Sequence, residues 1–191
     1  AVMGELAGWE RPNWYAHGDE NEYRHTYSKP NWFDACAHEC TAVRDHVALF
    51  DQSSYPVFWI SGTEALPCLQ HVCSNQLDVA VDQIVYTQWL NEDAGIEADV
   101  TITRTAADQF MVVAPCGSEG RDGAWLRRHA KGFECQIEQD HDLAIIGVMG
   151  PKSNLLLTRL FSDNSAIDAL PYYHSSVFQS NNLSVRANRL S

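Results

Sequence analysis

The stretch that decides the fold reads Tyr86-Thr-Gln-Trp-Leu-Asn-Glu-Asp-Ala-Gly-Ile-Glu-Ala-Asp-Val-Thr-Ile-Thr-Arg104, and Phe110-Met-Val-Val113 follows it closely. Aromatic and β-branched residues are frequent before the turn signal Ala94-Gly95, and apolar and polar residues alternate after it over residues 96–103. This pattern predicts a strand, a tight turn and a second strand, and a third strand over residues 110–114 after a short turn. The stretch therefore predicts antiparallel hairpins.

Two carboxylates, Glu97 and Asp99, stand at the start of the second predicted strand. Residues spaced i, i+2 on a strand point to the same face of a sheet. We expect both acids to lie on one face beside the aromatic rings of Tyr86 and Trp89. Such a grouping is typical of a ligand site, and the alternative is a solvated face of the sheet.

Further elements surround this hairpin. Apolar stripes with helical spacing predict helices over residues 34–47, 62–73, 118–131 and 153–161. Strands are expected over residues 55–60, 135–139 and 143–149, and a last hairpin is expected over residues 177–179 and 183–187. Residues 1–33 are rich in aromatics without clear periodicity, which predicts an extended arm packed on a body. The fold class is α+β, with mixed, mostly antiparallel sheets and flanking helices.

Composition excludes some function classes. The chain has 191 residues and a net charge of -12, so binding of nucleic acid or of an anionic lipid surface is disfavoured. It contains no run of 18 apolar residues and no signal-peptide pattern, so we expect no membrane span and no secretion signal. Its six cysteines mostly lie in apolar or helical patterns, which indicates reduced thiols and a cytosolic setting.

Motifs for metals and phosphates are weak or absent. Cys36-x-His38-x-Cys40 would place its ligands on different faces of a helix, so no metal site is predicted. The sequence has no Gly-x-Gly-x-x-Gly run, no Walker A run and no Gly-x-Ser-x-Gly elbow. This chain alone therefore shows no nucleotide-phosphate cradle and no hydrolase nucleophile.

A set of short motifs, taken in order, is more specific than any one of them. The set runs Glu39…Ala42-Val43-Arg44…Phe50-Asp51-x-Ser53, Ser61-Gly-Thr-Glu-Ala65, Tyr86-x-x-Trp-Leu-Asn91…Gly95-x-x-x-Asp99, Val112-Val113 and Gly150-Pro151. It resembles the aminomethyltransferase (glycine-cleavage T-protein) family, and is most similar to the folate domains of dimethylglycine and sarcosine dehydrogenases. Gly8-Trp-Glu-Arg-Pro-Asn-Trp-Tyr15 resembles the junction between the flavin and folate domains of those enzymes.

The resemblance implies a domain organisation. Residues 1–33 would be the arm or interdomain junction, residues 34–170 the N-terminal part of the folate-binding domain, and residues 171–191 the truncated start of the next sheet. In the family, a Gly-Glu-x-Gly-x-Glu segment that binds the pterin follows the position of Ser191. The resemblance therefore implies a fragment or one subunit of a split protein, with FAD only on a domain or subunit absent from this chain.

The resemblance also implies a site. Tetrahydrofolate would be the cofactor, Asp99 the catalytic carboxylate, and Tyr86, Trp89, Glu97 and Val113 the residues that bind substrate or cofactor. The family's first acid after the turn corresponds to Ala98 and its asparagine after the Val-Val pair to Ala114, so two polar contacts are missing. Asp99, or Glu97 on the same face, would have to serve instead.

The implied function is folate-dependent one-carbon transfer that forms 5,10-methylenetetrahydrofolate, in the folate half of a dimethylglycine- or sarcosine-type oxidase or dehydrogenase. The donor would be a small methylated amine, and the flavin domain or subunit would be a partner. A cytoplasmic location, or the mitochondrial matrix in a eukaryote, would suit this chemistry. The alternatives are a non-catalytic folate-binding or regulatory module and a folate-dependent demethylase.

Overall fold

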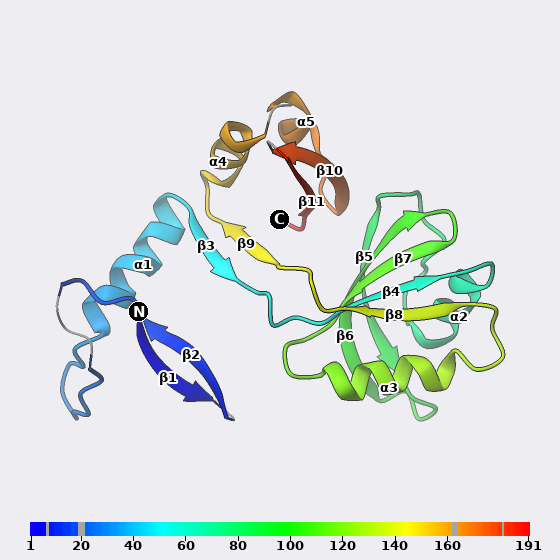
Figure 1. Cartoon of the computed structure of the whole chain (residues 1–191), viewed down its shortest axis with the longest axis horizontal. Helices are drawn as coiled ribbons and strands as arrows, with labels where there is room; N and C mark the ends of the chain where they lie inside the picture. Colours follow the sequence, from blue (N-terminus) through cyan, green and yellow to red (C-terminus); the bar gives the residue numbers. More distant parts are fainter. Residues whose placement is uncertain (7, 19–21, 162–163, 181) are drawn as a thin grey trace. The chain divides into compact units, whose positions relative to one another are not determined.

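The computed structural model describes residues 1–6, 8–18, 22–161, 164–180 and 182–191 (Figure 1). The chain divides into two compact units. The first comprises residues 1–50 and 148–156, and the second comprises residues 51–147 and 157–191. Among the described residues, no helix is both long and apolar enough to cross a membrane.

The first unit begins with a hairpin of β1 (Val2–Leu6) and β2 (Trp9–Trp14), which pair antiparallel. The helix α1 (Phe33–Asp45) follows. Strands β3 (Ala48–Asp51) and β9 (Ile146–Met149) pair with each other, although about a hundred residues separate them in the sequence.

The second unit is built on a five-stranded sheet whose strand order is β5-β6-β7-β4-β8. Its neighbouring strands are antiparallel. The strands are β4 (Val57–Ser61), β5 (Ile84–Leu90), β6 (Ile96–Ala106), β7 (Gln109–Val113) and β8 (Gln136–Asp140). Helices α2 (Ala65–Val72) and α3 (Glu119–His129) contribute to the same hydrophobic core as this sheet.

The core lies between one face of the sheet and these two helices. Strand residues two apart share a face, so Phe58 and Ile60 of β4 and Thr87 and Trp89 of β5 are all fully buried. Leu126 of α3 and Leu69 of α2 close the cluster from the helical side, and burial of large side chains of this kind is the main favourable term in folding.

A smaller apolar cluster lies at the C-terminal end of the second unit. Two further helices, α4 (Ser153–Leu160) and α5 (Asn164–Ala169), precede the antiparallel hairpin of β10 (His174–Ser180) and β11 (Leu183–Arg189). The ring centroids of Phe161 and Phe178 are 5.4 Å apart in this cluster. Arg186 ties the hairpin to the loop before β5, since its guanidinium donates to the Asp82 carboxylate at 3.3 Å.

The expected α+β class and the antiparallel hairpins are confirmed. The four expected helices are present within a few residues of their expected ends, as is the last hairpin. The expected extended arm over residues 1–33 is wrong in part, because β1 and β2 form a hairpin there. The helix α5 was not expected, and neither was the strand β3.

Candidate functional site

The turn between β5 and β6 is fixed by one asparagine side chain. Oδ1 of Asn91 accepts hydrogen bonds from the backbone N–H groups of Gly95, at 2.8 Å, and Asp93, at 3.1 Å. Ala94 has a φ of 60°, in the left-handed region that asparagine, aspartate and glycine visit more readily than alanine. This turn sets the register of the two strands that carry the candidate site residues.

The register separates the two faces of the hairpin. Gln88 pairs with Asp99 and Tyr86 pairs with Thr101 on the outer face, which is the face turned away from α2 and α3. The row of paired residues continues across β7 through Val113 and across β4 through Val57. Directly paired side chains on one face have Cβ atoms roughly 5 Å apart, so these residues form one continuous strip.

Asp99 accepts two hydrogen bonds on the same carboxylate oxygen. The Tyr86 hydroxyl donates to Oδ1 at 2.8 Å and the Gln88 amide donates to it at 3.0 Å. The Tyr86 hydrogen bond, followed by that of Gln88, holds the pKa of Asp99 below its ordinary value. Within the described part of the chain, both donors of this carboxylate converge on Oδ1, so Oδ2 is available to an incoming N–H group.

The pKa of Tyr86 is shifted in the opposite direction to that of Asp99. Its hydrogen bond to Asp99 raises the pKa of the phenol, because loss of the proton would remove the donor and place two anions side by side. Tyr86 is 47% exposed, so part of its surface is accessible to a ligand. Tyr86 and Asp99 thus form a neutral donor and an anionic acceptor at neutral pH.

Glu97 is held apart from Asp99. The pairing of β5 with β6 slips between Trp89 and Leu90, so Glu97 has no residue directly opposite it. This is a β-bulge, which re-aims the side chain of the inserted residue. Oε1 of Glu97 accepts from the Asn91 amide at 2.8 Å, whereas Asp99 is bound by Tyr86 and Gln88. The two acids therefore belong to two separate hydrogen-bond clusters.

Trp89 does not lie beside the acids. It pairs with Ala98 on the face that packs against the helices, and it is 0% exposed. The expectation that its ring joins Tyr86 on one face is wrong, because positions three apart on a strand point to opposite faces. Its physical role is core packing, so we leave Trp89 out of the proposed site.

Val113 is a half-buried residue at the end of β7, paired with Thr101 on one side and Val57 on the other. It therefore shares the outer strip with Tyr86. Sequence reasoning missed Gln88, although its even spacing from Tyr86 placed it on the same face. The structure thus brings Tyr86, Gln88, Asp99 and Val113 to one face.

A second polar contact lies on the same strip, on the far edge of the sheet. Asp140 of β8 pairs with Val57, and its carboxylate accepts a hydrogen bond from the Trp59 indole at 3.0 Å. This contact is the first cause of a lowered pKa of Asp140. Sequence patterns do not reveal this contact, because residues 59 and 140 are 81 positions apart along the chain.

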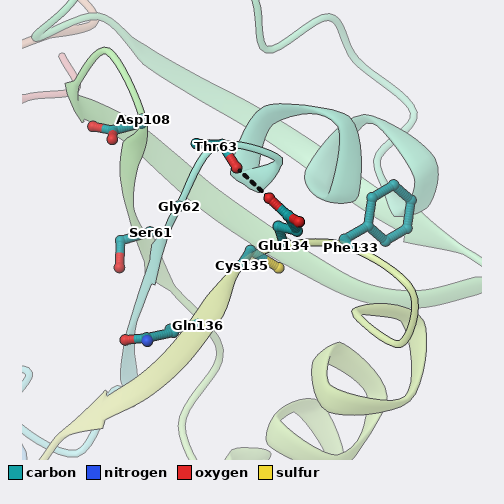
Figure 2. A pocket seen from close by; sticks show the side chains of 8 residues that line it. All are labelled: Ser61, Gly62, Thr63, Asp108, Phe133, Glu134, Cys135 and Gln136. Carbon is teal, nitrogen blue, oxygen red and sulfur yellow. Dashed lines mark hydrogen bonds between the residues drawn. The ribbon is translucent and has the colours of Figure 1, made fainter.

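A wide hollow of about 610 Å³ lies at the opposite end of β4 (Figure 2). It is lined by residues 61–63, Asp108 and residues 133–136. Thr63 donates to the Glu134 carboxylate at 3.2 Å, and the Glu134 N–H donates at 2.7 Å to the carboxylate of Glu64, which lies next to Thr63 in the sequence. This hollow is thus a structural junction between β8 and the start of α2.

No metal centre is apparent in the described part of the chain, where no three His, Cys, Asp or Glu side chains gather closely enough to hold an ion. All six cysteines are free thiols. The chemistry of the outer face therefore depends on the Asp99 carboxylate, its two donors and the aromatic and aliphatic side chains along the strip.

Comparison with known proteins agrees with the motifs and the fold. The family described as the GCVT N-terminal domain matches residues 1–191. The chain belongs to this family.

Among its relatives, the 4-methylaminobutanoate oxidase (formaldehyde-forming) of Paenarthrobacter nicotinovorans is 42% identical over 94% of this chain and 22% of that protein. The mitochondrial dimethylglycine dehydrogenase of Homo sapiens is 28% identical over 99% of this chain and 22% of that protein. The chain thus spans about a fifth of the length of these relatives.

Among solved structures, the glycine cleavage system aminomethyltransferase T from Bartonella henselae matches with a TM-score of 0.73 and 27% identity. The match covers 91% of this chain and 42% of that chain. The chain is thus an aminomethyltransferase-like domain whose relatives include oxidases and dehydrogenases.

Proposed function

We propose that this chain provides the folate-binding face of a one-carbon transferase that forms 5,10-methylenetetrahydrofolate, within a dimethylglycine- or sarcosine-type oxidase or dehydrogenase. The observation that carries the proposal is the Asp99 carboxylate, whose Oδ1 is occupied by Tyr86 and Gln88 while Oδ2 is available. The names of the relatives support a donor derived from a small methylated amine.

The residues on the outer face fit such a ligand. The exposed ring of Tyr86 and the side chain of Val113 provide aromatic and aliphatic surface for a planar heterocycle. The Asp99 carboxylate can accept hydrogen bonds from the N–H groups of that heterocycle. When bound, tetrahydrofolate would supply the amine nucleophile that takes up the one-carbon unit.

The lowered pKa of Asp99 determines which role this carboxylate fills best. It is ionised at neutral pH, so it can hold an N–H group and stabilise positive charge that develops nearby. The same shift makes it a weaker base, which favours electrostatic stabilisation over removal of a proton. Tyr86 keeps the carboxylate oriented, and its hydroxyl stays neutral because its own pKa is raised.

The flavin chemistry would belong to a domain or subunit outside this chain, and FAD would be bound there. The location would be the cytoplasm, or the mitochondrial matrix in a eukaryote, and the name of the mitochondrial relative supports the second of these. A non-catalytic folate-binding or regulatory role is the second candidate, and one observation favours it. Position 98, where the family carries an acid, is an alanine that is only 4% exposed and lies on the core face.

The test compares matched isosteric variants in the full protein that carries this chain. We expect Asp99→Asn to lower the yield of 5,10-methylenetetrahydrofolate from sarcosine and tetrahydrofolate at least about 100-fold. Glu97→Gln should reduce it less, and the exposed turn variant Asp93→Asn should leave it unchanged. If Asp99→Asn retains full yield, Asp99 has no catalytic role. If the unaltered protein binds tetrahydrofolate without forming product, the non-catalytic role is correct.

A further inference from the structure

Two cysteines that are far apart in the sequence meet at the junction between α2 and β8. Cys68 lies on α2 and is only 1% exposed. Cys135 directly precedes β8, is partly exposed and packs against the large hydrophobic core. The thiol groups of the two residues hydrogen-bond each other, and neither is part of a disulfide. They therefore form a reduced dithiol pair.

Hydrogen bonds of the backbone hold the two thiols in place. The Glu64 N–H donates to the Glu134 carbonyl at 3.2 Å, and the Glu134 N–H donates to the Glu64 carboxylate at 2.7 Å. Cys68 follows Glu64 by one helical turn, since its N–H donates to the Glu64 carbonyl at 3.0 Å, and residues four apart lie on the same side of a helix. Cys135 follows Glu134 directly. The same contacts that join α2 to β8 thus bring the two cysteines together.

Cys135 is the member of the pair that a reagent from solution meets first. It is one of the residues that line the hollow of about 610 Å³ at this junction (Figure 2). Cys68 is buried in the core, where only the neighbouring protein groups contact it. A small reagent in the hollow can therefore react with Cys135, whereas Cys68 can react with the modified Cys135 beside it.

The acidity of the buried thiol agrees with this order of reaction. Burial, followed by the neighbouring Cys135 thiol, raises the pKa of Cys68 to about 12. Because the thiolate is the nucleophile, Cys68 reacts slowly with any reagent. A neighbour held in contact compensates in part, since the second reaction is then intramolecular. The modified form of Cys135 should therefore persist long enough to be trapped.

We propose that Cys135 and Cys68 form an oxidation site for hydrogen peroxide, at which Cys135 is oxidised first and Cys68 then closes a disulfide between α2 and the start of β8. This modification site goes beyond the proposed folate function and does not depend on it. The hollow that gives access to Cys135 lies at the other end of β4 from the strip that carries Asp99.

The proposed chemistry takes place in two balanced steps. The Cys135 thiolate attacks one peroxide oxygen, so an S–O bond forms, the O–O bond breaks, and the leaving hydroxide takes up the thiol proton as water. The sulfur is oxidised by two electrons and the peroxide is reduced by two. The Cys68 thiolate then attacks the sulfenic acid sulfur, an S–S bond forms, and the hydroxide that leaves takes up the Cys68 proton as a second water.

The decisive experiment treats the folded full protein that carries this chain with hydrogen peroxide, blocks the remaining thiols by alkylation and maps the peptides by mass spectrometry without reduction. We expect a linked pair of peptides that contain Cys68 and Cys135, and its loss after treatment with dithiothreitol. Recovery of both cysteines unlinked would overturn the proposal, whether Cys135 is unchanged or is oxidised to the sulfinic or sulfonic acid. A link from Cys135 to Cys73 instead of Cys68 would overturn it as well.

Variants then assign the role of each thiol. In Cys68→Ala the sulfenic acid at Cys135 has no thiol to condense with, so dimedone should trap at least about tenfold more of it than in the unaltered protein. The matched control is Cys73→Ala, because burial also raises the pKa of Cys73 to about 12, and this variant should keep the link between Cys68 and Cys135. If Cys68→Ala and Cys73→Ala, both with the circular dichroism spectrum of the unaltered protein, give equal trapping at Cys135, Cys68 does not resolve the sulfenic acid.

Discussion

The Tyr86 hydroxyl donates a hydrogen bond of 2.8 Å to Oδ1 of Asp99 across the β5–β6 pair, and this contact moves the pKa values of the two groups apart. The carboxylate is held ionised and the phenol is held neutral. An acceptor and a donor are therefore maintained next to each other on a face that is open to solvent.

We expect Tyr86→Phe to raise the pKa of Asp99 toward its ordinary value, while Gln88 keeps part of the shift. Because the folded-state pKa of Asp99 is lowered, its stabilising contribution is present above the unfolded pKa of about 3.9 and is lost as pH falls through the folded value. Carbon-13 NMR titration of the Asp99 carboxyl group measures the shift directly. Tyr55→Phe is the control, and an unchanged Asp99 titration in Tyr86→Phe would contradict the assignment.

The contact between Trp59 and Asp140 predicts a pH-dependent indole signal. The indole N–H donates to the carboxylate at 3.0 Å and lowers the pKa of Asp140. The Trp59 indole resonance should therefore shift with an acidic transition below the ordinary aspartate value of about 3.9. Asp140→Asn should abolish this transition. A transition at the ordinary value, or one that survives in Asp140→Asn, would argue against the hydrogen bond in solution.

Gly62 is predicted to tolerate no side chain. Its φ is +131°, and a Cβ atom there would lie 2.5 Å from the Glu134 carbonyl oxygen. Gly62→Ala should lower the free energy of unfolding by about 2 kcal/mol or more, from backbone strain and from displacement of β8. Gly120→Ala is the control, because its site on α3 has open space and alanine is the better helix former by up to about 1 kcal/mol. Urea unfolding followed by circular dichroism measures both, and equal stability of the two variants would refute the close approach.

Thiol reactivity should differ sharply among the cysteines. Burial, followed by the neighbouring Cys135 thiol, raises the pKa of Cys68 to about 12, and burial raises the pKa of Cys73 to about 12. The thiolate is the reactive form, so neither should react with iodoacetamide near neutral pH until the chain unfolds. Cys40 and Cys116 are exposed and should react first. Peptide mapping by mass spectrometry after timed alkylation measures this order, and early labelling of Cys68 in the native state would contradict the buried position.

The hairpins of the large sheet could be predicted because the alternation of apolar and polar residues matches the strand period. The same alternation, applied strictly, separates Trp89 from Tyr86 and joins Gln88 to it. The bulge at Glu97 could not be predicted, because one inserted residue leaves no mark in the composition of the strand. Two acids that looked equivalent in the sequence therefore have different partners.

Other elements could not be predicted from the sequence, for different reasons. Strand β2 contains Pro12, a residue that normally indicates an edge strand or no strand, so its hairpin with β1 was not foreseen. Strand β3 pairs with β9 from far along the chain, and only tertiary structure can show such a pairing. The contact between Trp59 and Asp140 was missed for the same reason.

The strict alternation along β5 has an evolutionary consequence. Thr87 and Trp89 are fully buried, so selection for stability acts on them, whereas under the proposed function selection for ligand binding would act on their neighbours Tyr86 and Gln88. Mutations can accumulate at one set of positions with little thermodynamic effect on the other. If the proposed function is correct, a gene lineage could thus exchange one-carbon donors or lose activity while it retains the same scaffold. A mutational scan of β5 should show tolerance that alternates residue by residue.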